Sequence, residues 1–327
     1  MKTKINIRAE LYLGFFLLFI VLLLLVFAPK FFSLNNIMSI LNRFSYLLIS
    51  AIAMTLIIIT ANIDVSAGSL VSVICLFLAA VGKTGANFGV LLLAAVAMGV
   101  FLSLFNVMLI TIFDIPAIVV TLATSQVFTG VMPLFVEGSI YDLPPSFTWL
   151  GFKAKMFGFI PASILIMIIV TVFFLVFMKY TRFSKKVYAI GNNIESARLS
   201  GINVTKVKIG VFLIAGILYG ISAIIIVTAS QRVTMTMGMG LEMQFIAATL
   251  LGGTSVSGGR GTILGTVFGA LILACIAPAS NYLGINPDYS DLVTGIIIVA
   301  TVVINLLNSN QKVTQIQIGL PKGAAIR

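Results

Sequence analysis

The sequence predicts an all-α polytopic membrane protein with about ten transmembrane helices. Of its 327 residues, 60% are hydrophobic and 9% are charged, whereas charged residues make up about a quarter of an ordinary soluble domain. Apolar runs of about 20 residues, long enough to cross a bilayer as helices, recur along the whole chain. We therefore expect residues 1–327 to form one transmembrane domain rather than a string of soluble domains.

The expected spans follow one another with short turns between them. They cover residues 11–28, 46–60, 66–81, 89–113, 117–135, 160–178, 209–228, 241–251, 261–277 and 292–307. Residues 31–42 mix apolar side chains with asparagine and are expected at the outer interface. Glycines recur every fourth residue at Gly216 and Gly220, and at Gly261, Gly265 and Gly269, which predicts bare helix faces that a neighbouring helix can approach closely.

The positions of the lysines and arginines predict the orientation. With the amino terminus inside, 14 of the 20 fall on the cytoplasmic side: in the tails 1–10 and 308–327, in 179–208, and at Arg260. The other six are Lys30, Arg43, Lys83, Lys153, Lys155 and Arg232. Because positively charged loops stay in the cytoplasm, both termini are expected there. The net charge of +11 then reflects membrane topology, not a nucleic-acid-binding face.

Several classes of chemistry are excluded by composition. The sequence has no histidine, so histidine acid–base catalysis and histidine metal sites are ruled out. Cys75 and Cys275 both fall within expected spans, which argues against a disulfide framework. Gly82-Lys83-Thr84 lacks the glycine that a phosphate-binding loop places five positions earlier, where Phe77 stands. We expect no catalytic residue, no metal and no cofactor, and therefore not an enzyme.

The loop 180–208 is the one long charged segment between two spans. Residues 193–200 are compatible with a short helix, with Gly191 before it and Gly201 after it. One interpretation is a solvated basic loop that only fixes the topology. The other is a docking helix for a cytoplasmic partner.

Two further polar segments interrupt the apolar background. In residues 63–69, Asp64 is expected to cap the following helix, to face an aqueous pathway or to hold an ion pair, since a lone carboxylate in lipid is costly. Residues 252–261 are rich in glycine, and irregular backbone at membrane depth persists only inside protein or beside a water-filled cavity. With Leu264 where a dinucleotide fingerprint requires its third glycine, this second segment is expected to be a hinge or pathway element.

A weak internal match relates these two segments. Laid over residues 254–259, residues 63–68 share valine, serine and the last glycine at a constant offset. This match supports the hypothesis that the chain consists of two pseudo-repeated halves, as many transporters do.

Three blocks together resemble the ribose-type ABC importer permeases, a family that also includes permeases for other sugars and for autoinducer-2. The first block runs from Arg182-Phe183 through 188–192 to 197–202, the second is 63–69, and the third is 251–255 with 258–261. Their order and the hydrophobic background fit over nearly the whole chain. The sequence is thus identified as resembling this family.

The resemblance implies a multi-pass inner-membrane (plasma-membrane) subunit without an ATPase site, importing a monosaccharide or related polyhydroxylated solute. It implies ABC ATPase subunits on the cytoplasmic side, an extracytoplasmic substrate-binding protein, and a second permease copy or paralogue. It also implies that the loop 180–208 couples to the ATPase through Arg182, Tyr188, Gly191, Asn192, Ala197, Arg198 and Gly201. Pathway or hinge candidates are Asp64, Ser66, Gly68, Ser69, Thr121, Gln126, Glu242, Gly252, Gly253, Thr254 and Ser255.

Alternatives remain open at this stage. The polar side chains of the 117–135 span could bond to neighbouring helices rather than face a sugar. An autoinducer-2 permease of the same family is an alternative substrate assignment, because the residues do not separate pentose, hexose and autoinducer-2. An ion-coupled secondary transporter is the rival of a different class. It would need acidic residues within spans, and only Asp64 and Glu242 qualify.

Overall fold

The computed structural model describes residues 7–134, 138–140, 143–149, 155–156, 160–284, 289, 292, 295–296 and 299. Most of the expected tenth span, 292–307, and the carboxyl-terminal tail lie outside the described residues. The α-helices are α1 (Ile7–Phe27), α2 (Leu34–Ile59), α3 (Ala67–Gly82), α4 (Phe88–Ile112), α5 (Ala117–Val131), α6 (Ala162–Tyr180), α7 (Arg182–Asn192), α8 (Ile194–Leu199), α9 (Val204–Ser230), α10 (Leu241–Leu251) and α11 (Ile263–Tyr282).

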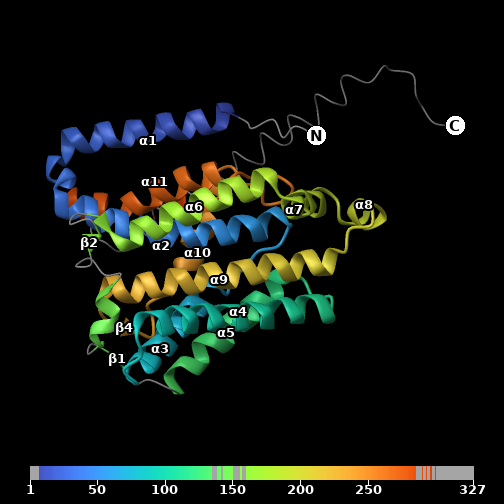
Figure 1. Ribbon diagram of the computed structural model, residues 1–327. Coiled ribbons are helices and arrows are strands. Elements are labelled where there is room, and N and C mark those ends of the chain that lie inside the picture. The colour runs from blue at the N-terminus through green and yellow to red at the C-terminus, as the bar shows by residue number, and fades with distance from the viewer. Residues whose placement is uncertain are drawn as a thin grey trace.

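These helices form a bundle whose long members run roughly side by side (Figure 1). Six helical segments of the described residues are long and apolar enough to cross a membrane: Leu34–Ile59, Phe88–Ile112, Ala117–Leu134, Ala162–Tyr180, Val204–Ser230 and Ile263–Tyr282. Helices α3 and α10 are shorter apolar helices. The expected all-α polytopic architecture is therefore confirmed, while the total of about ten spans stays a prediction.

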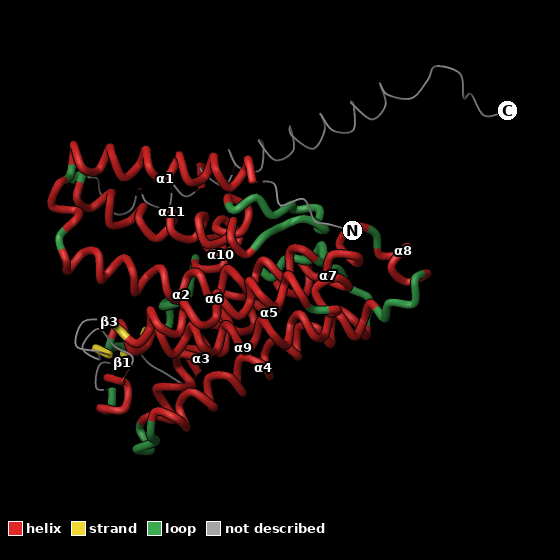
Figure 2. Tube along the Cα trace, turned by 45° about the horizontal axis from the view of Figure 1, so that its top comes forward, coloured by secondary structure: helices red, strands yellow, loops and turns green. Residues whose placement is uncertain are grey.

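The two ends of the bundle differ. Helices α7 and α8 lie at one end, and the short strands lie at the other (Figures 1 and 2). There β1 (Ser139–Ile140) pairs antiparallel with β4 (Val233–Thr234), and β2 (Lys155–Met156) pairs with β3 (Ile160–Pro161). We call these ends the α8 end and the β4 end.

Helix α2 is the buried centre of the bundle and packs against α6, α9, α10 and α11. It begins at Leu34, so residues 34–42 belong to the same helix as the span. The prediction that they form a separate segment at the outer interface is therefore wrong. The polar residues that interrupt the apolar run are accommodated inside the bundle, where Ser163 of α6 donates to Asn42 Oδ1 at 2.6 Å. Arg43 was assigned to the outer loops by the charge balance but lies within α2, where it donates to Gln244 of α10.

A short cap at the β4 end is formed by the 3-10 helix η3 (Pro145–Trp149). The ring of Phe147, in η3, is fully buried. It lies over Gly82 at the end of α3, where a Cβ would meet the ring. Gln231 donates from Nε2 to the Phe147 carbonyl at 3.2 Å. The Gly82-Lys83-Thr84 stretch is thus a turn beneath an aromatic side chain.

Helices α3 and α10 both begin inside the bundle. With 16 and 11 residues they extend about 24 and 17 Å, less than the roughly 30 Å of a hydrocarbon core. Their first turns meet where Gly68 of α3 lies against the Glu242 side chain of α10. One turn further along α3, Ser72 Oγ accepts from the Gly238 amide, just before α10, at 2.8 Å. Residues 60–66 and 235–240 are the non-helical segments that lead into these helices. Protein surrounds most of this irregular backbone, as membrane depth requires.

Close helix crossings occur where the glycine spacing predicts them. Helices α4 and α9 touch at Gly99 and Gly216, and a Cβ at Gly220 would lie 2.5 Å from the Ala95 carbonyl oxygen. Helices α10 and α11 touch through Gly252 and Gly265 in the same way. The expected faces at Gly216 and Gly220 and at Gly265 and Gly269 are therefore filled by neighbouring backbone. Gly261 was expected on the same helix face but precedes α11, where it meets the side chains of Thr254 and Ile59.

The α4–α9 crossing should be intolerant of a methyl group. We predict that Gly216→Ala lowers the stability of the purified protein by about 1–3 kcal/mol, the usual cost of overpacking a tight core, because its Cβ would overlap the Gly99 carbonyl. Thermal unfolding in detergent measures this. Gly130→Ala on α5, where nothing lies within 4 Å of the new Cβ, is the matched control. Equal Tm values for the two variants would contradict the crossing.

Candidate functional site

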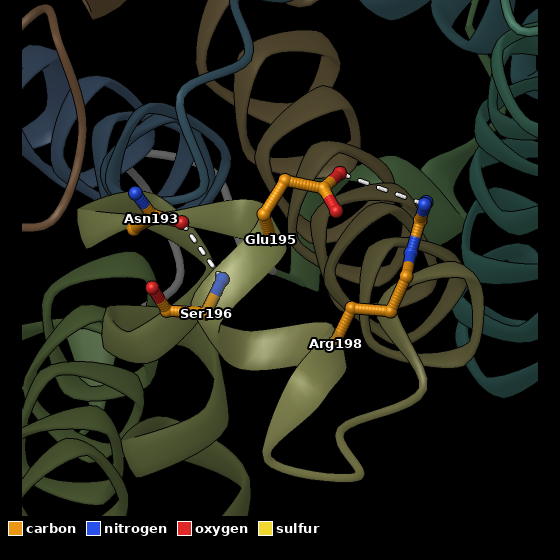
Figure 3. Close-up of polar contacts among 4 residues, drawn as sticks. All are labelled: Asn193, Glu195, Ser196 and Arg198. Atoms are coloured by element: carbon orange, nitrogen blue, oxygen red, sulfur yellow. Dashed lines mark hydrogen bonds and ion pairs between the residues drawn. The ribbon is translucent and has the colours of Figure 1, made fainter.

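Helix α8 stands out at the α8 end as a short, solvent-facing helix with defined caps. Asn193 Oδ1 accepts from the Ser196 amide at 2.7 Å at its start, and Glu195 lies 3.5 Å from Arg198 on its outer side (Figure 3). After its end, Gly201 has φ +79° and Ile202 donates back to the Ala197 carbonyl at 3.1 Å, a Schellman arrangement. The expected helix at 193–200 is thus present.

The side chains of α8 divide into an inner and an outer set. Ala197 is 3% exposed and packs inward, whereas Leu199 is 88% exposed. An exposed pair such as Glu195–Arg198 contributes little stability, so the outer face is held by its caps rather than by that pair. Leu199 was not among the residues singled out from the sequence. Its signal is a large apolar side chain in the last turn of a polar helix.

Gly191 does not precede α8 directly as expected. It lies near the end of α7, an amphipathic helix that buries Val187 and Ile190 against the bundle. The helix is capped by Thr181, whose hydroxyl accepts from the Ser184 amide at 3.2 Å. The sequence predicted only one helix in this loop, at 193–200. Helix α7 forms as well, because its apolar residues recur every three to four positions.

Helix α7 docks onto the glycine-rich segment 252–262. The Tyr188 hydroxyl donates to the Gly261 carbonyl at 2.7 Å, and Asn192 donates from Nδ2 to the Gly259 carbonyl at 3.4 Å. Burial raises the pKa of Tyr188 to about 12, so its hydroxyl remains a donor at physiological pH. Residues expected in two separate roles, coupling and hinge, are therefore in direct contact.

The end of α2 joins the same contact. The Gly259 amide donates to the Ile59 carbonyl at 2.9 Å. Gly191 lies against that carbonyl and the Gly259 nitrogen, with no room for a Cβ. Gly258, at φ +81°, lies against Ala61, where an added Cβ would be 2.8 Å from the alanine Cβ. We call this contact of α7, the α2 end and residues 258–261 the glycine junction.

The rest of the glycine-rich segment is a compact loop. Gly252 ends α10 and Gly253 follows in the left-handed region at φ +84°. Thr254 is fully buried and its amide donates to the Thr249 carbonyl, while the Ser255 amide donates to the Arg260 carbonyl. The segment is thus a broken connection between two helices, packed by its own backbone bonds.

Asp64 lies in the non-helical link from α2 to α3 and is fully buried. Its Oδ1 accepts from the Ser66 amide at 3.0 Å and from the Ser66 hydroxyl at 2.5 Å. Asn106 of α4 donates to Ser66 Oγ at 2.7 Å. The other carboxylate oxygen, Oδ2, is buried, and the side chain of Tyr219 of α9 lies beside it with its hydroxyl directed at the carboxylate.

This arrangement bears on the three roles considered for Asp64. It bonds to the residue that precedes α3, as a capping side chain would. No lysine or arginine of the described residues lies within 4.0 Å of it. Asn106 and Tyr219, the partners on α4 and α9, were not singled out from the sequence, since isolated polar residues in an apolar run give no pairing signal.

The other pathway candidates are spread over α3, α5 and α10. Gly68 lies in the first turn of α3 against the Glu242 carboxylate of α10, with no room for a Cβ, and Ser69 donates to the Ser66 carbonyl at 2.9 Å. Thr121 is fully buried, while Gln126, one and a half turns further along α5, is exposed. The candidates therefore do not line one surface: most support the starts of α3 and α10.

Comparisons with known proteins place the chain in a family. Residues 36–302 match the family model described as "Branched-chain amino acid transport system / permease component". The chain is 33% identical over 297 residues to the ribose import permease protein RbsC of Escherichia coli (strain K12), covering 88% of this chain and 91% of that protein. It is 36% identical over 297 residues to the probable ABC transporter permease protein YphD of the same strain, covering 89% and 88%.

A third relative is the autoinducer 2 import system permease protein LsrC of Photorhabdus luminescens, 31% identical over 282 residues and covering 86% of this chain and 85% of that protein. No solved structure matches the chain. The chain belongs to this family of membrane-embedded permease components.

The glycine junction predicts a local effect. Gly191→Ala should separate α7 from the α2 end, because the new Cβ would overlap the Ile59 carbonyl. Amides in 252–262 should then exchange with deuterium at least about tenfold faster, as expected when a bond of about 1.5 kcal/mol is lost. Gly89→Ala, where the nearest atom is 3.4 Å away, is the control. Unchanged exchange in both variants would show that the contact does not exist in the membrane-embedded protein.

Thr121 offers a second test, because its hydroxyl accepts from the Val65 amide at 3.1 Å and donates to the Ile63 carbonyl at 3.2 Å. Thr121→Val keeps the shape and leaves both backbone groups unpaired, so we predict a loss of about 1–3 kcal/mol with an unchanged KM for solute. Thermal unfolding and uptake kinetics measure the two quantities. A raised KM with unchanged stability would instead place Thr121 in contact with solute.

Proposed function

We propose that the chain is the translocation subunit of an ATP-driven importer for a monosaccharide or a related polyhydroxylated solute. Its family is one of permease components, and relatives covering most of its length are named for ribose and autoinducer 2 import. The observation that carries the ATP-driven mechanism is α8, a capped helix with an exposed apolar side chain at one end of a membrane bundle. That is the form a docking element for a soluble partner takes.

Energy must come from that partner. The only Gly-Lys-Thr of the sequence is a turn at the β4 end and lacks the upstream glycine of a phosphate-binding loop. The permease therefore has no ATPase site of its own, and ABC ATPase subunits bind at the α8 end. Arg182, exposed at the start of α7, and Arg198 on the outer face of α8 are the basic residues offered to them.

The charge distribution supports a cytoplasmic α8 end. Arg260 lies between Gly259 and Gly261, which both accept from α7, whereas Lys83 and Arg232 follow Gly82 and Gln231, which both contact Phe147 of the cap. With Arg43 moved into α2, five lysines and arginines remain for the outer loops against 14 for the inner side, which strengthens the bias. On this orientation both termini are cytoplasmic in the inner (plasma) membrane, with 1–10 and 308–327 as tails of a permease domain spanning 1–327.

The glycine junction supplies the coupling route. Movement of α8 by an ATPase would displace α7, and α7 contacts both the α2 end and residues 258–261. The α2 end leads through residues 60–66 to Asp64 and α3, and the other segment leads into α10 and α11. A single displacement would thus reach both helices that begin inside the bundle, provided that the ATPase contacts differ between the two states.

Further partners follow from the family assignment. An extracytoplasmic solute-binding protein would dock at the cap of the β4 end, and a second permease copy or paralogue would complete the pathway. Two pseudo-repeated halves and a total of about ten spans remain predictions of the sequence. Autoinducer-2 import is the alternative within the family, and the ligand of the companion binding protein decides between the two. Among the described residues, neither Asp64 nor Glu242 forms an ion pair that favours the ion-coupled rival.

Leu199 tests the docking surface without disturbing the bundle. Leu199→Asp should reduce co-purification of the ATPase subunits and ATP-dependent solute uptake by about tenfold or more, because an apolar anchor of an interface is typically worth 2 kcal/mol or more. Pull-down and uptake into proteoliposomes measure this. Thr84→Asp, exposed at the β4 end, places the same charge at the opposite end of the bundle and should leave co-purification of the ATPase subunits unchanged. Normal ATPase binding and uptake by Leu199→Asp would refute the docking assignment.

A further inference from the structure

Arg43 is a cation inside the bundle, far from either end of its helix. It is the tenth residue of α2, so it lies about 14 Å along the axis from Leu34 and about 24 Å from Ile59. Its side chain is partly exposed. Arginine remains charged at any physiological pH, and an ionisable side chain within a membrane span indicates a functional site unless a partner neutralises it.

The structure shows one hydrogen bond for this guanidinium and no counter-ion. Arg43 donates from Nη2 to Gln244 Oε1 of α10 at 3.1 Å. No carboxylate of the described residues lies within 4.0 Å of it, and Glu242 is turned toward Gly68 of α3. A guanidinium has five N–H donors. Nε is buried without an acceptor, and no further bond of Arg43 to the described residues is formed.

Snorkelling toward the outer interface does not account for this geometry. A snorkelling arginine extends its charged group to the headgroups and keeps its stem in the apolar layer. Here the charged group crosses to a neighbouring helix, and Gln244 fixes it there by its carbonyl oxygen. The arrangement is that of a guanidinium presented sideways from α2, with several donors unused.

Beside this pair, α10 has an open side. It is formed by Met243 of α10, 47% exposed, together with Met239, 54% exposed in the segment that leads into the helix, while Leu241 and Phe245 on the other side of α10 are buried. Methionine is flexible and adapts to differently shaped ligands. The open side of α10 thus combines two adaptable apolar side chains with a positively charged donor group at their edge.

We propose that the open side of α10 faces the water-filled solute pathway and that Arg43, oriented by Gln244, is its solute-contacting and specificity-determining residue. The guanidinium fork matches paired acceptor oxygens, such as vicinal hydroxyls or a carboxylate. It therefore selects oxygen-rich solutes and excludes cations. This assignment rests on the proposed function, because it takes the bundle to be a solute pathway.

The first experiment detects the pathway without knowledge of the solute. The thiol of Met243→Cys, in a Cys75→Ala/Cys275→Ser background and in the reconstituted transporter, is treated with anionic and cationic methanethiosulfonates. We expect both reagents to react. Adding Arg43→Gln should lower the anionic-to-cationic rate ratio roughly five- to tenfold, because a nearby positive charge attracts the anionic reagent and repels the cationic one. Ile169→Cys, 59% exposed on α6, is the control and should be unreactive. No reaction at position 243, or a ratio insensitive to Arg43→Gln, overturns the proposal.

The second experiment measures specificity with radiolabelled D-ribose as the probe, chosen from the named relatives. Arg43→Gln should lower kcat/KM for uptake roughly ten- to hundredfold, the range for a hydrogen bond to a charged group. ATPase binding and unfolding temperature should stay unchanged. Arg43→Lys keeps the charge but loses the guanidinium fork, so its kcat/KM should lie between those of the wild type and Arg43→Gln. If Arg43→Gln lowered both the unfolding temperature and ribose uptake, Arg43 would have a structural role and the proposal would be wrong. Ribose uptake absent from the wild type, together with normal thiol results, would refute the ribose assignment and leave the pathway intact.

Discussion

The structure depends on one backbone hydrogen bond, from the Gly259 amide to the Ile59 carbonyl at 2.9 Å. It joins two segments that are 200 residues apart in the chain and that both interrupt helices. Gly191 is pressed against the same carbonyl from a third segment. Carbonyls at a helix end lack intrahelical partners, and inside a membrane each must find one. The end of α2 finds it in the glycine-rich loop, which fixes where α7, α3 and α11 lie.

This constraint explains why the loop between α10 and α11 contains so much glycine. At Gly258 and Gly259 the backbone has positive φ and passes within contact distance of Ala61 and Asn192. Any larger residue there would have a strained backbone and a Cβ that overlaps one of these neighbours. The same segment receives bonds from Tyr188 and Asn192 of α7. A direct contact between backbones transmits displacement better than a contact through flexible side chains, because close-packed elements shift together rather than deform. On the proposed function, the energy of ATP hydrolysis enters the bundle at this contact.

The sequence was informative where physics acts locally. Apolar runs predicted most helices, glycine spacing predicted the crossings near Gly216 and Gly265, and a glycine predicted the end of α8 at Gly201. It failed where polar residues are satisfied over long range. Asn42 was expected at the outer interface and Arg43 in an outer loop, because their partners, Ser163 and Gln244, lie 121 and 201 positions away. For the same reason the sequence did not reveal that Tyr188 contacts Gly261, or that Asn106 holds Ser66.

The central claim is that α7 and the glycine-rich loop move as one body when the ATPase acts. Spin-label distances in the reconstituted complex test it, with pairs at Lys186→Cys and Arg260→Cys and at Arg260→Cys and Thr84→Cys, all at exposed positions. On adding ATP, the first distance should stay constant while the second, between the two ends of the bundle, changes. A first distance that changes while the second stays fixed would show that α7 moves away from the loop, and would contradict the account.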